Sequence, residues 1–358
     1  MHIKFQPSLK LIVLVRIAKK ILYSLCLRVK ERKWFSSRSD VTKKYSSEIA
    51  LTIKKLFSGL DSLHFTEKQI FGIIKSLNLE IQEWFYHHRR ILHGKDLYFF
   101  QTLCWRSYGI IDTFETAHRL VQDDNVKIEE RFDLSCKYFF DDYARILWKK
   151  LSLSERKCLV EKYDKIERMK YVIAKLRFGL RINSIKMFRF CEDKNYFREN
   201  YLGLRYYFKN LEPKAKYLCL LHNLNHNKVH HFDLYLCFAE MDIKEIKSLF
   251  HSLGDSCRFR IIKSFLRFPL QALFTDIVTP LWSYISPFNY RNVLHFMIHE
   301  RIRVKWRDFD YIQLMKYLWH RCPKGHRKSF KKDKLYNLFE RIVWTPPYKG
   351  KPLISNNC

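Results

Sequence analysis

A cluster of histidines between residues 219 and 237 is the sharpest candidate for chemistry in this sequence. Its members, with the cysteines that flank them, are His222, His226, His230, His231, Cys219 and Cys237. On an α-helix, residues four apart share one face, so the first three histidines could bind zinc together. Asn223, Asn225 and Asn227 alternate with them, however, and asparagine favours loops over helices. We therefore interpret the segment as a solvated loop between helices and predict that it holds no metal.

A second group of metal-ligating types lies near the C-terminus and comprises His320, Cys322 and His326. It lacks the tight Cys or His pairs that are typical of structural zinc sites. Cys322 also falls in an apolar stripe, which favours packing in the core. We predict no metal site here either.

Two pairs of carboxylates, Asp123-Asp124 and Asp141-Asp142, could in principle supply acid and base catalysis. Adjacent residues on a helix point about 100° apart, so neither pair forms an evident couple. The strings GxSxG, GxxxxGK[ST], HExxH and GxGxxG are all absent. We predict no catalytic residue, no cofactor and no enzymatic activity. An enzyme with a dispersed site is the competing interpretation, and no particular residue supports it.

Aromatic residues beside a basic one, as in Tyr206-Tyr207-Phe208-Lys209, could stack on single-stranded bases. Here the aromatic falls within a helical apolar stripe, so packing in the core is the prediction.

The elements that must position all of these residues follow from a pattern that recurs five times. It centres on Trp148, Phe208, Phe250, Trp282 and Trp319. In each copy, apolar residues lie four before, one before and three after the aromatic, although Ala144 and Cys322 are weak members. Residues three and four apart stack on one face of a helix, so each stripe predicts an amphipathic helix.

A helix breaker follows each stripe, and a second helix is expected directly after it. The breakers include Pro213, Gly254, Pro287 and Gly325, which suit helix ends and first turns. A basic residue then lies eight or nine positions after the aromatic, and an apolar one lies eleven after it. Each copy is thus predicted to be a helical hairpin.

The predicted fold is all-α: a stack of helical hairpins, similar to an α-solenoid but with irregular repeats. Hairpins of this kind resemble ankyrin-like or HEAT-like solenoids in shape only, because ankyrin's Thr-Pro-Leu-His signature is absent. Just 9 Gly and 9 Pro in 358 residues also favour helices over a turn-rich β fold.

The predicted organisation has three parts. Residues 1–35 form an N-terminal amphipathic helix or cap, 46–343 a single α-helical repeat domain, and 345–358 a disordered tail rich in proline. Helices are expected at Phe65 to Leu77 and at Leu79 to Leu92.

Ten cysteines occur without a CxxC pair, which predicts buried, reduced thiols in an intracellular protein that is cytoplasmic, with a nuclear location as the alternative. No apolar stretch approaches the roughly 20 residues that span a bilayer, so no membrane span is expected.

The formal net charge of +31, from 67 Lys and Arg against 36 Asp and Glu, predicts weak binding to any polyanion. The basic residues are spread along the chain and are densest between Arg321 and Lys334. A solvated helical face is one interpretation of that run, and contact with nucleic acid or anionic lipid is the other.

Because no catalytic constellation is visible and stacked hairpins form extended surfaces, we predict a scaffold that binds another protein. The alternative is a basic solenoid that binds nucleic acid.

Overall fold

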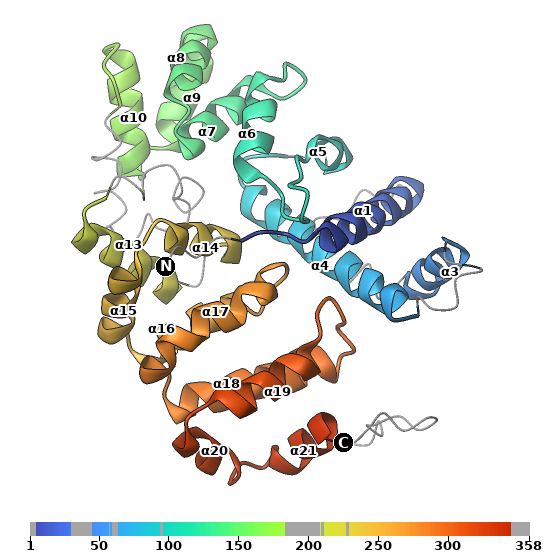
Figure 1. Ribbon diagram of the computed structural model, residues 1–358. Coiled ribbons are helices and arrows are strands. Elements are labelled where there is room, and N and C mark those ends of the chain that lie inside the picture. The colour runs from blue at the N-terminus through green and yellow to red at the C-terminus, as the bar shows by residue number, and fades with distance from the viewer. Residues whose placement is uncertain are drawn as a thin grey trace. The chain divides into compact units, whose positions relative to one another are not determined.

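The computed structural model of the chain describes residues 5–29, 45–56, 58, 64–93, 96–182, 208, 211–226 and 229–344. Within these ranges the ordered elements are helices and there is no β-strand; one isolated antiparallel bridge pairs Trp105 with Ile111 (Figure 1). The predicted all-α class is confirmed. None of the helices in these ranges has the length and apolar character needed to cross a bilayer.

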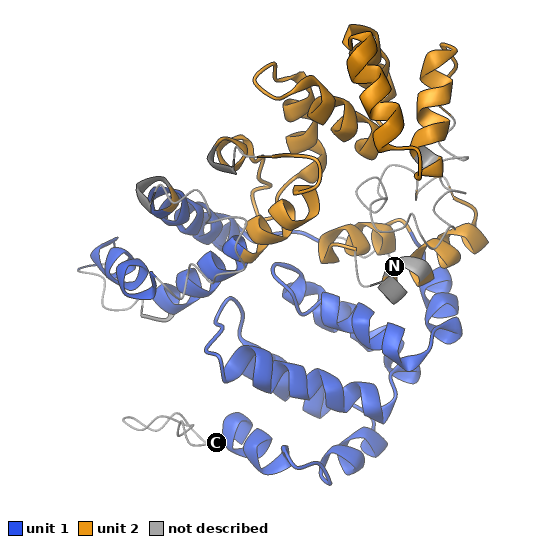
Figure 2. Cartoon of the chain, turned by 180° about the vertical axis from the view of Figure 1, so that it is seen from behind, with its two compact units in different colours: residues 1–25, 41–78, 241–358 blue, residues 26–40, 79–240 orange. Residues whose placement is uncertain are grey.

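The chain divides into two compact units (Figure 2). Unit 1 comprises residues 1–25, 41–78 and 241–358, and unit 2 comprises residues 26–40 and 79–240. The predicted limits of 1–35 and 46–343 stay predictions. The predicted tail, 345–358, lies outside the described residues.

Unit 1 contains most of α1 and all or part of twelve further helical segments. These are α1 (Leu9–Val29), α3 (Ser46–Leu56), the first part of α4 (His64–His88), α15 (Ile243–Ser252), α16 (Asp255–Ser264), η3 (Leu270–Leu273), α17 (Phe274–Val278), η4 (Thr279–Tyr284), α18 (Pro287–Met297), the π-helical η5 (Ile298–Ile302), α19 (Tyr311–Arg321), α20 (Lys324–Phe330) and α21 (Tyr336–Trp344). Helix α18 contacts both α16 and α20, and α19 contacts α21.

Unit 2 contains the last residues of α1 and the last part of α4, and it continues through shorter helices. These are α5 (Asp96–Thr102), α6 (Thr113–Gln122), α7 (Ile128–Tyr138), α8 (Asp141–Lys150), α9 (Leu153–Lys162), α10 (Glu167–Arg177), α13 (Pro213–His226) and α14 (His231–Ala239). Helix α7 packs between α6 and α8. The fully buried residues Phe99, Phe132 and Tyr138 contribute to the core of unit 2.

Helix α4 runs without a break where two helices were predicted. Asn78, the expected boundary, is buried, as are Leu77 and Ile81 on either side of it. Neither glycine nor proline interrupts the chain at this point. Packing of the apolar neighbours therefore outweighs the weak helix propensity of asparagine.

The second helices of the five predicted hairpins start at equivalent positions. The second helix begins five residues after the aromatic in every copy, at Leu153, Pro213, Asp255, Pro287 and Lys324. In three copies the residue three after the aromatic caps the first helix, and its N–H donates to the carbonyl one turn back. The three donor–acceptor pairs are Leu151–Leu147, Leu253–Leu249 and Cys322–Leu318.

The arginine eight residues after the aromatic closes the hairpin in two copies. The Arg156 side chain donates from Nε to the carbonyl of Trp148 at 3.0 Å and from Nη2 to that of Lys149 at 2.9 Å. Arg258 makes the same pair of bonds to Phe250, at 2.7 Å, and His251, at 3.1 Å. These carbonyls belong to the last turn of the first helix, where carbonyl groups have no hydrogen-bond donor within the helix. The guanidinium therefore caps the C-terminus of that helix.

Four of the five central aromatics are buried, and Trp282 is half-buried. Trp282 lies in the short 3-10 helix η4 and not in an α-helix, so its stripe is less regular than in the other copies. The apolar residues eleven positions after the aromatics are all buried: Leu159, Cys219, Ile261, Val293 and Phe330.

Candidate functional site

A pocket of about 560 Å³ lies within unit 1, and we call it the basic pocket. It is lined by residues of α4, α19 and α21 and by the segment from Arg301 to Asp310. Its basic residues are Lys68, Arg301, Lys305, Arg307 and Lys316, and its apolar and aromatic residues include Ile302, Trp306, Ile312, Ile342, Val343 and Trp344. Asp310 is the acidic residue of the lining. The volume falls in the usual range for ligand sites.

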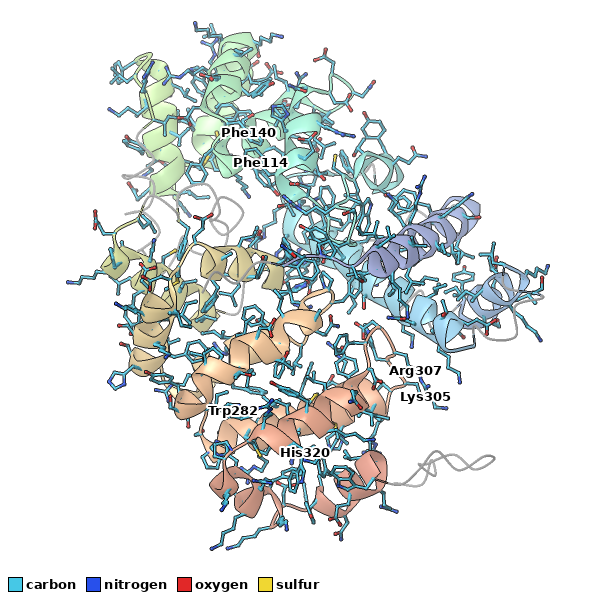
Figure 3. All side chains as sticks on the ribbon, in the orientation of Figure 1. Phe114, Phe140, Trp282, Lys305, Arg307 and His320 are labelled. Atoms are coloured by element: carbon cyan, nitrogen blue, oxygen red, sulfur yellow. The ribbon has the colours of Figure 1, made fainter. Side chains whose placement is uncertain are left out.

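Asp308 anchors the loop that carries Lys305 and Arg307. This carboxylate is buried and accepts hydrogen bonds from Ser76 Oγ, Gln271 Nε2 and the Tyr311 hydroxyl, each at 3.0 Å. Burial raises the pKa of Asp308, and the charge of Arg301 and the hydrogen bonds from Ser76 and Tyr311 oppose that rise. The loop is therefore held on α4, and Figure 3 shows Lys305 and Arg307 on its outer side.

Trp306 forms one wall of the basic pocket and carries two cations on its ring. The Arg301 guanidinium lies 4.9 Å and the Lys75 ammonium 5.9 Å from the ring centroid. The indole N–H donates to Ser76 Oγ at 3.2 Å, which fixes the ring on α4. Arginine and lysine over a tryptophan face are attracted by the ring quadrupole.

Trp344 also lines the pocket and is 46% exposed. The ammonium of Lys316 lies 5.9 Å from its centroid, and His320 meets it edge-on at 5.5 Å. Exposed aromatic surface beside positive charge is what an acidic ligand with an apolar group would contact.

Unit 2 holds a second group, the His–Glu cluster, which consists of Glu80, Glu83, His230 and His231. Glu80 and Glu83 lie one turn apart on α4, so they share a face. His230 is the N-cap of α14, and His231 is its first residue. One potential ligand atom from each side chain lies within 4.8 Å of the others.

His230 is the centre of this cluster. Its Nε2 lies 2.9 Å from Glu80 Oε2 and 3.6 Å from Glu83 Oε2. Burial lowers the pKa of His230, but the two glutamates and Asp233 outweigh this and raise it to about 9. A cationic ring has no acceptor, so the ion pair excludes the 3.3 Å hydrogen bond from the Phe232 N–H to Nδ1. The attraction of two nearby carboxylates outweighs the loss of that one long hydrogen bond.

The histidine segment predicted to be a loop is in part a helix. Helix α13 extends through His222 to His226, because buried Leu220 and Leu224 give it an apolar face. The side chains of His222 and His226 lie outside the described residues. Cys219 and Cys237 are buried. The structure instead brings His230 and His231 to glutamates about 150 positions away, which local spacing does not reveal.

The second predicted group does not converge on one point. His320 is exposed and meets Trp344, whereas His326 is buried and donates from Nε2 to the Ile285 carbonyl at 2.7 Å. Cys322 is buried, as core packing predicts. The eight cysteines among the described residues are free thiols, and Cys158 alone of these is exposed, contrary to the prediction that the cysteines are buried.

The carboxylate pairs have separate structural roles. Asp123 caps α6 and accepts a hydrogen bond from the Tyr98 hydroxyl, and Asp124 pairs with Arg131. Asp141 and Asp142 lie in the first turn of α8. Burial raises the pKa of Asp141 to about 6, although Arg145 opposes the rise.

Phe208, from the predicted base-stacking run, is buried, and Tyr206, Tyr207 and Lys209 lie outside the described residues. The sequence interpretation missed Trp306, which belongs to none of the five stripes. Its close spacing to Arg301, Lys305 and Arg307 is the signal that could have revealed the basic pocket.

No protein-family model matches the chain, and neither does any curated protein or solved structure. The roles of these residues therefore rest on their geometry.

Proposed function

We propose that this chain is a protein-interaction module whose basic pocket binds an acidic segment of a partner protein. The observation that carries the proposal is the composition of that pocket: its lining includes five basic residues, two tryptophans and several apolar residues, with Asp310 as the acidic residue. Asp310 is already engaged, because its side chain accepts from the Gln313 N–H as the N-cap of α19. An occupant with negative charge is therefore favoured.

The apolar residues of the pocket lining favour an occupant that also has an apolar group. Ile302, Ile312 and Ile342 can bury an apolar side chain, and such buried anchors supply most of the energy of peptide recognition. A short segment with an apolar or aromatic residue between acidic ones fits both features.

We further propose that the hairpins of unit 1 are stacked copies of one unit, which would present the pocket at one edge of a solenoid. Two observations support this: the common register of the hairpins, and the contacts of α18 with α16 and with α20. Stacked hairpins bury their apolar faces against their neighbours and create extended binding surfaces.

Nucleic-acid binding is the competing function, since the net charge of +31 attracts any polyanion. A base that stacked on Trp306 would have to displace Arg301 or Lys75 from the ring. The arrangement therefore favours an acidic peptide over a stacked nucleotide.

Selection from a random peptide library on the full chain at about 150 mM salt tests the proposal, with single-stranded RNA as competitor. We expect acidic peptides with an apolar residue to be enriched and RNA not to displace them. The double variant Lys305→Glu with Arg307→Glu should weaken binding at least tenfold. The control, Lys328→Glu with Lys331→Glu, makes the same charge change at exposed residues outside the lining and should bind as the wild type does. Equal losses in both variants, or displacement by RNA, would contradict the proposal.

A further inference from the structure

We propose that the His–Glu cluster of unit 2 is a binding site for a divalent transition-metal cation such as Zn²⁺. Its ligands would be carboxylate oxygens of Glu80 and Glu83 and imidazole nitrogens of His230 and His231. This inference is independent of the basic pocket, because it concerns different residues in the other unit.

The donor set of the cluster fits a divalent cation. Imidazole nitrogen and carboxylate oxygen are both ordinary zinc ligands, and four donors complete a tetrahedral site. Two carboxylates also balance the charge of a divalent cation. The donors come from two helices far apart in sequence, so the cluster is not a run of neighbouring acidic residues.

The distances between the donor atoms are close to those of a tetrahedral zinc site. Zinc–ligand bonds of about 2.0–2.1 Å place the donors of a tetrahedron roughly 3.3 Å apart. His230 Nε2 lies 2.9 Å from Glu80 Oε2 and 3.6 Å from Glu83 Oε2, on either side of that value. All four donors lie within 4.8 Å of one another, so small side-chain rotations would complete the site.

The surroundings of the ligands also fit a metal site. Glu80 Oε1 accepts from the backbone N–H of Ile111 at 3.1 Å, which orients the carboxylate and leaves Oε2 toward the cluster. Glu80 and His231 are 6% and 4% exposed. Ligands held by outer hydrogen bonds and shielded from water are typical of metal sites. Glu83, at 30% exposure of its side chain, offers the route by which a cation would enter.

Binding through His230 Nε2 would place the remaining ring proton on Nδ1. Nδ1 already carries a proton in the ion pair with Glu80, so metal binding would release only the Nε2 proton. In return the cation would link α4 to the N-terminus of α14.

The test uses the full chain, stripped with a chelator and titrated with Co²⁺ and then with Zn²⁺. We expect one equivalent of Co²⁺ to give the visible absorption of a tetrahedral nitrogen and oxygen site, Zn²⁺ to displace it, and the melting temperature to rise with either ion. An intense sulfur-to-cobalt charge-transfer band would place the metal on cysteines and overturn the proposal. So would the absence of stoichiometric binding.

Two variants locate the site. Glu83→Gln preserves the size of a partly exposed side chain and should weaken metal binding at least about tenfold, because one anionic ligand is lost. The control, His251→Ala, removes an exposed histidine of unit 1 and should bind as the wild type does. If the control loses the metal and Glu83→Gln retains it, the four residues form a buried ion pair and not a metal site. The wild-type spectrum decides the question even if Glu83→Gln does not fold.

Discussion

Gly72 shows how one residue determines where the pocket loop lies. A Cβ atom at this position would lie 2.3 Å from the backbone nitrogen of Asp308 and 2.4 Å from the carbonyl carbon of Arg307. No L-side chain fits such a gap, so the missing Cβ lets the loop approach α4. Ser76, one turn further on α4, then donates to the Asp308 carboxylate.

Replacing Gly72 with alanine is therefore expected to destabilise the chain. Alanine in a helix normally gains about 1 kcal/mol over glycine, but the backbone contacts would have to give way, at a cost of about 1–3 kcal/mol or more. The free energy of unfolding in urea measures the difference. Gly325→Ala is the matched control, because it lies in α20 with open space around the added Cβ, and it should be neutral or stabilising by up to about 1 kcal/mol. Equal effects at the two glycines would show that Gly72 does not seat the loop.

His88 is a buried histidine whose protonation state follows from its two partners. Its Nδ1 lies 2.7 Å from the Trp84 carbonyl and its Nε2 2.7 Å from the Tyr138 hydroxyl. Nδ1–H therefore donates to the carbonyl, and Nε2 accepts from Tyr138. Burial lowers the pKa of His88 to about 3; the hydrogen bond to Trp84 opposes this, and the nearby His87 and Lys137 add to it. The ring is neutral at physiological pH.

Stability should fall as the pH decreases because of this histidine. Between pH 6.5 and about 3 the unfolded chain binds a proton at His88 that the folded chain does not, which costs about 1.4 kcal/mol per pH unit at this site. Urea unfolding of the wild type and of His88→Gln from pH 4 to 7 measures it, and the variant should show the shallower dependence. His251→Gln, at an exposed histidine, should follow the wild type. Parallel curves for all three proteins would be the contrary result.

At the scale of elements, helices begin and end at the positions that the sequence pattern marks, and these positions are set by local sequence. The apolar stripe forms the first helix, the residue three after the aromatic ends it, and the second helix starts five after. In two copies an arginine then caps the first helix. The sequence could predict this register because stripes, breakers and caps act within about ten residues.

Phe250 and Trp282 separate the contribution of burial from that of the pattern, because both occupy the central position of the pattern. Phe250 is fully buried, so Phe250→Ala should cost about 3–5 kcal/mol. Trp282 is half-buried in a 3-10 helix, so Trp282→Ala should cost about 1–2 kcal/mol, in proportion to the smaller apolar area it buries. Denaturant midpoints of the two variants are the measurement, and an equal loss at both positions would contradict it.

Contacts between distant segments are what the sequence could not supply. Glu80 and His230 meet through the tertiary fold, and no spacing rule links residues so far apart. Trp306 and Trp344 come together through α19 and α21 in the same way. Even within α4, the predicted break at Asn78 is wrong because burial of its neighbours outweighed a local preference. Local rules therefore predicted where several helices begin and end but neither candidate site.

At the scale of the whole molecule, the charge of +31 is the dominant property, and its effect must be separated from that of the basic pocket. A field of this size attracts any polyanion, and each neutralised phosphate releases counterions, so such binding weakens steeply with salt. Specific binding would persist where this field is screened.

A salt titration with single-stranded RNA and duplex DNA makes that separation. We expect both to bind at low salt and to be nearly lost at about 150 mM, where the Debye length is roughly 8 Å, without preference for sequence or strandedness. The reason is that Trp306, on the pocket loop, already carries Arg301 and Lys75 on its ring. Lys305→Glu with Arg307→Glu and its control, Lys328→Glu with Lys331→Glu, should shift the low-salt affinity alike, because they change the total charge alike. Sub-micromolar, sequence-dependent binding at physiological salt, lost only in the pocket variant, would instead make nucleic acid the partner of this pocket.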